Sequence, residues 1–222
     1  MDWQALSLSI KLAAWTVLLL VPLAVLVGRA LARTALRGKF WIEALLALPL
    51  VLPPTVLGFY LLAGIGGASA VGRLYQQLFG QSLAFSFPAL LLASVIFNLP
   101  FAIQPVQRAF EAIPQDVRDA AACCGMSRGQ ALARIELPLA WSGILSGAVL
   151  TFAHTLGEFG VVLMVGGSIP GETRTIAIAI YDRAQALDYA AANRMSATLL
   201  VISMATIALS YGLSARVGRR RG

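Results

Sequence analysis

The chain has 222 residues, of which 59% are hydrophobic and 12% are charged, and its mean hydropathy is +0.79. Soluble domains carry about 25% charged residues, so this composition excludes an ordinary water-soluble enzyme or binding module. The net charge of +7 comes from Lys and Arg clustered between apolar runs, which is typical of membrane orientation and not of nucleic-acid binding. We therefore predict an all-α, polytopic membrane protein with one transmembrane domain over residues 1–222.

The first apolar run covers about residues 12–28, and the basic cluster follows this run instead of preceding it. A secretory signal peptide carries its basic residues before its apolar core, so we expect this run to stay in the protein as a membrane anchor. The basic residues after it are Arg29, Arg33, Arg37 and Lys39.

Each of the first three apolar runs contains prolines. The second and third runs cover about residues 44–65 and 84–103. A proline removes a backbone donor and frees a carbonyl that lipid cannot satisfy. We therefore predict interrupted helices whose breaks face other helices or a water-filled path, with an ordinary kinked packing helix as the alternative at each proline. The prolines are Pro22, Pro49, Pro53, Pro54, Pro88 and Pro100.

The fourth and fifth apolar runs cover about residues 141–165 and 196–213, and the fourth begins with Gly143 and Gly147, a spacing that permits close helix approach. Five spans place the termini on opposite sides of the membrane. Of the seventeen Lys and Arg residues, twelve lie in one set of loops and five in the other. The positive-inside rule then predicts a cytoplasmic carboxyl terminus and an outer amino terminus. The cytoplasmic set ends with Arg216, Arg219, Arg220 and Arg221.

A polar stretch at about residues 108–140 separates the third and fourth spans and predicts two short helices with a corner between them. Pro114 suits a first helical turn, and Gly125 suits a left-handed helix end. Ser127 and Gln130 form a capping box for the second helix, which we expect to end near Pro138. One apolar stripe on the first helix consists of Val117, Ala120, Ala121 and Cys124.

The spacing of this stretch resembles the EAA signature of permease subunits in ATP-binding-cassette (ABC) importers, with Asp119 in place of the usual Glu. The resemblance implies the permease fold of type I importers and a coupling helix that seats in a cleft of a separate ATPase subunit. An amphipathic hairpin on the membrane surface is the alternative. The residues it assigns to ATPase coupling are Asp119, Ala120, Ala121, Gly125, Met126, Ser127, Ile135, Leu137 and Pro138.

The chain has no phosphate-loop motif, since its only lysines are Lys11 and Lys39 and no glycine lies at the required position upstream of Gly38-Lys39. We therefore expect a transport subunit, not an enzyme, that binds no cofactor, with ATP and Mg²⁺ on the partner. The only cysteines, Cys123 and Cys124, are adjacent, which supports neither a disulfide framework nor a metal site.

Three further segments resemble molybdate permeases: residues 48–60, residues 156–160, and residues 169–176 with Ile180-Tyr181-Asp182 after them. This resemblance implies molybdate or the similar tungstate as cargo, and the short length disfavours sulfate permeases, which are the alternative. It also implies a homodimer with two ATPase subunits inside and a molybdate-binding protein outside, in a bacterial or archaeal cytoplasmic membrane.

A path for a dianion should offer neutral donors, because Lys or Arg would hold the anion too tightly for release. Hydroxyl and amide groups near helix breaks meet that need, so we predict a path lined by Thr55, Ser94 and Asn98, together with Glu158. Local capping of kinked helices is the alternative for each of these residues.

His154 and Glu158 are spaced to share one face of the fourth span, and an ionisable group at membrane depth costs roughly 2.5–3.5 kcal/mol. They predict either a hinge or packing contact, which we favour, or the proton relay of a stand-alone carrier. An intramembrane enzyme is disfavoured because no nucleophile and base pair is evident.

The outer stretch from Gly166 to Arg194 predicts an amphipathic helix at the outer mouth, on the membrane surface or against a binding protein. Its apolar stripe consists of Ile176, Ile180, Ala184, Leu187 and Ala191.

Overall fold

The computed structural model describes residues 1–34 and 37–219, although most side chains beyond residue 209 are not described. The described part consists of helices and their connections, with no strand. Four helices are long and apolar enough to cross a membrane, or five if the bent pair α2–α3 is one span, in agreement with the predicted number. Arg220 and Arg221 of the predicted basic cluster lie outside the described residues.

The helices are α1 (Trp3–Arg33), α2 (Lys39–Val51), α3 (Pro54–Ile65), α4 (Ala70–Phe79), α5 (Phe87–Glu111), α6 (Gln115–Cys123), α7 (Arg128–Ala131), the π turn η1 (Leu132–Glu136), α8 (Leu137–Gly157), α9 (Gly160–Gly166), α10 (Ile176–Gln185) and α11 (Tyr189–Arg219).

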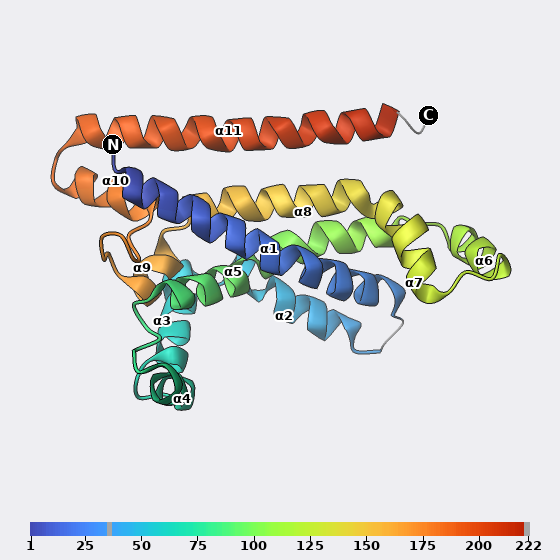
Figure 1. Ribbon diagram of the computed structural model, residues 1–222, viewed down its shortest axis with the longest axis horizontal. Coiled ribbons are helices and arrows are strands. Elements are labelled where there is room, and N and C mark those ends of the chain that lie inside the picture. The colour runs from blue at the N-terminus through green and yellow to red at the C-terminus, as the bar shows by residue number, and fades with distance from the viewer. Residues whose placement is uncertain (35–36, 220–222) are drawn as a thin grey trace.

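Helices α1, α5 and α8 pack against one another and form the centre of the molecule (Figure 1). Small residues allow the close approach that was predicted. A Cβ atom at Gly143 would lie 2.6 Å from the Pro105 carbonyl oxygen, and one at Gly147 would lie 2.8 Å from that of Ala102. The α5 and α8 backbones therefore touch at these two glycines, where any side chain would force them apart.

Only one of the three runs predicted to be interrupted contains a break at a proline. Helix α1 continues through Pro22, and α5 begins at Phe87, with Pro88 in its first turn, and continues through Pro100. The second run divides into α2 and α3, which meet at an angle of 109°. The pair Pro53-Pro54 removes two successive donors and holds the residue before each proline in an extended conformation, so no helix can pass. A single proline removes only one donor, and a long apolar helix tolerates that loss.

The fourth predicted span, residues 141–165, is also broken, which the sequence did not predict. Helix α8 ends at Gly157, Glu158 is extended, and α9 begins at Gly160. No proline lies at this break. Glu158 instead accepts a backbone hydrogen bond from Val161 at 2.9 Å, and this bond supplies an acceptor for one unpaired N–H group of α9.

The two ends of the molecule carry different short helices (Figure 1). Helices α6 and α7 project at the end that also holds the end of α11, whereas the amino terminus and α10 lie at the opposite end. The predicted outer amphipathic helix is shorter than expected: α10 ends at Gln185, and Leu187 has a φ of 59°. Leu187 and Ala191 therefore do not continue the stripe. Helix α4 was not predicted, although Ser69 caps its start and Gly80 ends it in the left-handed region.

Candidate functional site

The corner between α6 and α7 has the local structure that its sequence predicts. Helix α6 follows Pro114 and ends with Gly125 at a φ of 72°. The Gly125 N–H donates to the Ala122 carbonyl at 2.9 Å, and the Met126 N–H donates to the Ala121 carbonyl at 3.1 Å. These two bonds define a Schellman motif, which satisfies the last carbonyls of α6 and turns the chain sharply.

The second helix begins as predicted but does not end as predicted. The capping box forms, since the Ser127 hydroxyl accepts from the Gln130 N–H and the Gln130 side chain accepts from the Ser127 N–H. The expected end near Pro138 is wrong, because α7 continues through η1 into α8. In η1 the Leu137 N–H donates to the Leu132 carbonyl five residues earlier, and this shifted register admits Pro138 near the start of α8. The corner is therefore directly continuous with a membrane-spanning helix.

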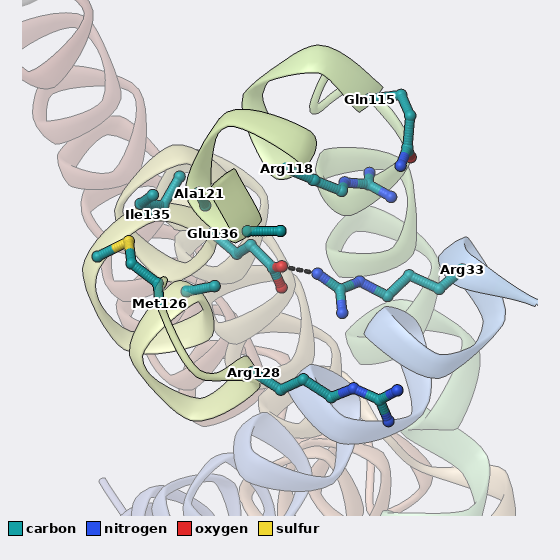
Figure 2. Close-up of a pocket in the computed structure, with 10 residues that line it drawn as sticks. Arg33, Gln115, Arg118, Ala121, Met126, Arg128, Ile135 and Glu136 are labelled. Atoms are coloured by element: carbon teal, nitrogen blue, oxygen red, sulfur yellow. Dashed lines mark ion pairs between the residues drawn. The ribbon is translucent and has the colours of Figure 1, made fainter. Parts of the chain in front are cut away.

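The other predicted coupling residues divide between the outer surface of this corner and its interior. Asp119 and Ala120 are exposed on α6, whereas Ala121 is buried. Met126 and Ile135 are half-buried and line a pocket behind α6 (Figure 2). The exposed members are available to a partner, and the buried ones hold α6 against the rest of the chain.

Glu136 is a site residue that the sequence analysis missed. Its side chain is 2% exposed, its Oε2 atom lies 2.6 Å from Arg29 Nε, and its carboxylate also pairs with Arg33 (Figure 2). This ion pair joins the π turn to the end of α1. A signal existed, because Glu136 is the only acidic residue between Asp119 and Glu158 and lies at the start of an apolar run near a basic region.

Arg118 joins α6 to α5. Its guanidinium donates to the carbonyl of Phe110 at 2.7 Å and to that of Ile113 at 2.9 Å. The first of these carbonyls belongs to the last turn of α5 and also accepts from the Ile113 N–H at 3.3 Å. Together with the Glu136 pair and the continuity of α7 with α8, this contact connects the corner to all three central helices.

Behind α6 lies a pocket of about 310 Å³ between α1, α6, α7 and η1 (Figure 2). Figure 2 shows the guanidinium groups of Arg33, Arg118 and Arg128 along one side of it, with the Glu136 carboxylate next to Arg33. The full lining is Arg33, Gln115, Arg118, Ala121, Ala122, Met126, Arg128, Ala131, Ile135 and Glu136.

The predicted path residues do not all come together. Ser94 and Asn98 are fully buried between α1, α5 and α8, where Ser94 accepts from the Thr16 hydroxyl at 2.9 Å. The Asn98 amide donates to the Ser94 carbonyl at 2.8 Å, and its oxygen lies 3.0 Å from His154 Nδ1. Thr55 is exposed near the start of α3. Ser94 and Asn98 thus join helices within the chain, and a role for these residues in a path stays a prediction.

His154 and Glu158 do not face each other along one helix, because α8 ends at Gly157. His154 is stacked between Phe97 and Phe101, with ring centroids 4.9 Å and 3.9 Å away. The Glu158 carboxylate is directed to the backbone of α9. This arrangement favours the hinge or packing interpretation over a proton relay.

Reactive side chains elsewhere are sparse. Cys123 and Cys124 are free and exposed at the end of α6. Across residues 1–34 and 37–219, no group of three His, Cys, Asp or Glu side chains could hold a metal ion.

Comparison with known proteins agrees with this geometry. The family described as "Binding-protein-dependent transport system inner membrane component" matches residues 20–221. The chain is 43% identical over 210 residues to a molybdenum transport system permease protein of Azotobacter vinelandii, covering 95% of this chain and 93% of the relative. It is 35% identical over 223 residues to the protein of the same name in Escherichia coli, covering 99% and 96%.

The fold agrees as well. The solved structure of a bacterial ABC transporter involved in the import of the acidic polysaccharide alginate matches with a TM-score of 0.78 at 16% identity, covering 96% of this chain and 78% of that chain. The predicted fold of an ABC importer permease is confirmed. The chain thus belongs to the family of binding-protein-dependent transport system inner membrane components, and it is a multi-pass inner membrane transport subunit, not an enzyme.

Proposed function

We propose that the chain is the channel-forming permease subunit of an ATP-driven importer of molybdate, or of the similar anion tungstate. The support for the cargo is the similarity to molybdenum transport permeases over nearly the full length of the chain. The support for coupling to an ATPase is the α6–α7 corner. ATP and Mg²⁺ belong to the partner in this proposal, since the sequence has no phosphate-loop motif.

The proposal rests on the contacts that connect α6 and the α6–α7 corner to the central helices. The helix presents exposed side chains, including Asp119 and Ala120, at one end of the molecule. Behind it, Arg118 connects to α5, Glu136 connects to α1, and the chain itself continues into α8. A force applied to α6 by a partner therefore reaches all three central helices, as a coupling helix requires.

The partners follow from this arrangement. Two copies of the chain would enclose the path, with one ATPase subunit beneath each α6 and a molybdate-binding protein at the opposite end. Arg29 and Arg33 pair with Glu136 of η1, and Lys39 pairs with Glu111 at the end of α5, which favours a cytoplasmic position for the α6 end of the molecule and an outer amino terminus. A solved relative, a bacterial alginate ABC transporter, is in complex with an alginate pentasaccharide-bound periplasmic protein.

In this proposal, closure of the ATPase dimer draws the two α6 helices together and opens the path outward by alternating access. The breaks at Pro53-Pro54 and at Glu158 supply segments that can change their angle. Neutral donors such as Thr55, Ser94 and Asn98 would line the path as the helices separate. Membrane lipid surrounds the dimer.

To test coupling to the ATPase, two single variants are compared, each with an arginine in place of an exposed alanine. Ala120→Arg alters the docking face of α6, and Ala133→Arg is the matched control on η1, outside the predicted docking set. We expect Ala120→Arg to lower recovery of the ATPase with the affinity-tagged permease by about tenfold or more, which corresponds to about 1.4 kcal/mol, and to abolish molybdate uptake. The control should retain both.

Two results would contradict the proposal. One is equal ATPase recovery and uptake in the two variants, and the other is uptake that survives ATP depletion, as a stand-alone proton-coupled carrier predicts. The cargo is tested separately by competition: unlabelled tungstate should displace labelled molybdate from uptake at much lower concentration than sulfate. A reversed order would assign the chain to sulfate-type oxyanion transport.

A further inference from the structure

The pocket behind α6 contains more positive charge than its neighbours balance. Arg33, Arg118 and Arg128 line it, and Arg29 joins the same cluster through Glu136. The cluster therefore contains four guanidinium groups and one buried carboxylate, which pairs with Arg29 and Arg33. Such a concentration of like charge is unfavourable unless an anion joins it.

The acidic residues of α6 do not supply that anion. Asp116 and Asp119 are exposed and are absent from the pocket lining. The Asp119 carboxylate instead accepts a hydrogen bond from the Gln115 amide at 2.9 Å. Glu136 is shared by two arginines already, so its charge is fully engaged.

Two hydrogen-bond donors in the cluster lack acceptors. Arg29 Nη2 and Arg118 Nε are buried and have no hydrogen-bond partner. The Arg128 side chain is exposed and makes no hydrogen bond or ion pair with any residue that the structure describes, and Figure 2 shows its guanidinium on the same side of the pocket as that of Arg33. Buried polar groups without partners are rare and mark places where a ligand, ion or water is bound.

We propose that this pocket binds a phosphate-type oxyanion. The guanidinium fork matches the oxygens of such an anion in a bidentate manner, and about 310 Å³ is ample space for one tetrahedral group. The anion has two possible sources with the same chemistry: the headgroup of an acidic phospholipid, since Arg33 ends a membrane-spanning helix, and a free oxyanion from solution. Bound there, it neutralises the cluster that connects α6 to α1.

This inference goes beyond ATPase coupling and is tested on the permease alone, so its failure and that of the proposed function are distinguishable. The informative variant is Arg128→Gln, because the Arg128 side chain makes no hydrogen bond or ion pair with any described residue and its loss leaves the Arg118 and Glu136 contacts intact. Arg134→Gln is the control, since Arg134 is exposed on η1, lies outside the pocket and changes the net charge equally.

The permease is reconstituted in nanodiscs of zwitterionic phosphatidylcholine and titrated with inorganic phosphate, and its thermal midpoint is also compared in nanodiscs that contain phosphatidylglycerol. We expect the thermal midpoint to rise with phosphate concentration until it saturates. Arg128→Gln should weaken the apparent affinity for phosphate by about tenfold or more, and Arg134→Gln should leave it unchanged. A response to inorganic phosphate identifies a free oxyanion, and a response to phosphatidylglycerol alone identifies a lipid headgroup. No response to either probe, or equal losses in both variants, would overturn the inference.

Discussion

Polar side chains serve opposite purposes at the α6–α7 corner and in the centre of the helix bundle. At the corner, Gly125, Ser127 and Gln130 satisfy backbone groups within a few residues of themselves, so the chain turns where its sequence directs. In the centre, Thr16, Ser94, Asn98 and His154 satisfy one another across three helices.

The difference shows how far each kind of polar group constrains movement. A local cap fixes a turn but leaves the whole corner free to move as a body. A hydrogen bond between helices fixes the distance between two membrane spans and must break or shift if those spans separate. The corner is thus built to transmit a displacement, and the central cluster is built to hold one arrangement of α1, α5 and α8.

The largest test of this comparison is the ion pair that connects the two regions. We expect Glu136→Gln to lower the free energy of unfolding by about 3 kcal/mol, because it leaves Arg29 and Arg33 without their shared carboxylate. Thermal unfolding of the purified permease measures the loss. Glu172→Gln, at an exposed position between α9 and α10, is the control and should have no effect. Equal midpoints in the two variants would show that the Glu136 ion pair does not hold the corner against α1.

The second test concerns the contact of α5 with α8. Gly143→Ala places a methyl group 2.4 Å from the Ala109 Cβ atom and 2.6 Å from the Pro105 carbonyl oxygen, so the two helices must move apart. Overpacking of this kind costs about 1–3 kcal/mol. Gly64→Ala is the matched control, because nothing lies within 4 Å of a Cβ atom there. A thermal midpoint that is unchanged in Gly143→Ala would mean that α5 and α8 are not in contact in the membrane.

The third test separates holding the bundle from lining a path. Asn98→Leu removes the partner of His154 and leaves a buried polar group unpaired, which we expect to lower stability by about 1–3 kcal/mol and to reduce uptake. Thr55→Val, at an exposed position, should leave the thermal midpoint unchanged and still reduce molybdate uptake. Full uptake in Thr55→Val at normal protein levels would remove Thr55 from the path.

The same contrast explains what the sequence predicts and what it does not. The corner was predicted nearly residue by residue, because Pro, Gly and the capping pair act on their own backbone. The exception is Pro138, where the π turn changes the hydrogen-bond register and lets the helix continue.

Tertiary partners account for the other differences. Pro22 and Pro100 were predicted to interrupt their helices, but each lies within an uninterrupted helix. The break at Glu158, in contrast, has no proline. Glu136 was missed because its arginine partners lie more than a hundred residues earlier in the chain. Such pairings follow from the fold, and no local pattern in the sequence encodes them.

The smallest expected effect lies at the corner itself. Ser127→Ala removes the hydroxyl that accepts from the Gln130 N–H, and loss of a helix cap costs about 1 kcal/mol. We expect hydrogen exchange to speed up by about fivefold in α7 and to stay unchanged in α5, because a cap acts on its own first turn. Ser7→Ala, where an exposed hydroxyl only donates to the Gln4 carbonyl within α1, is the control. Faster exchange that spread from Ser127→Ala into α5 would show that the corner and the central bundle unfold together, and the corner could then not move as a separate body.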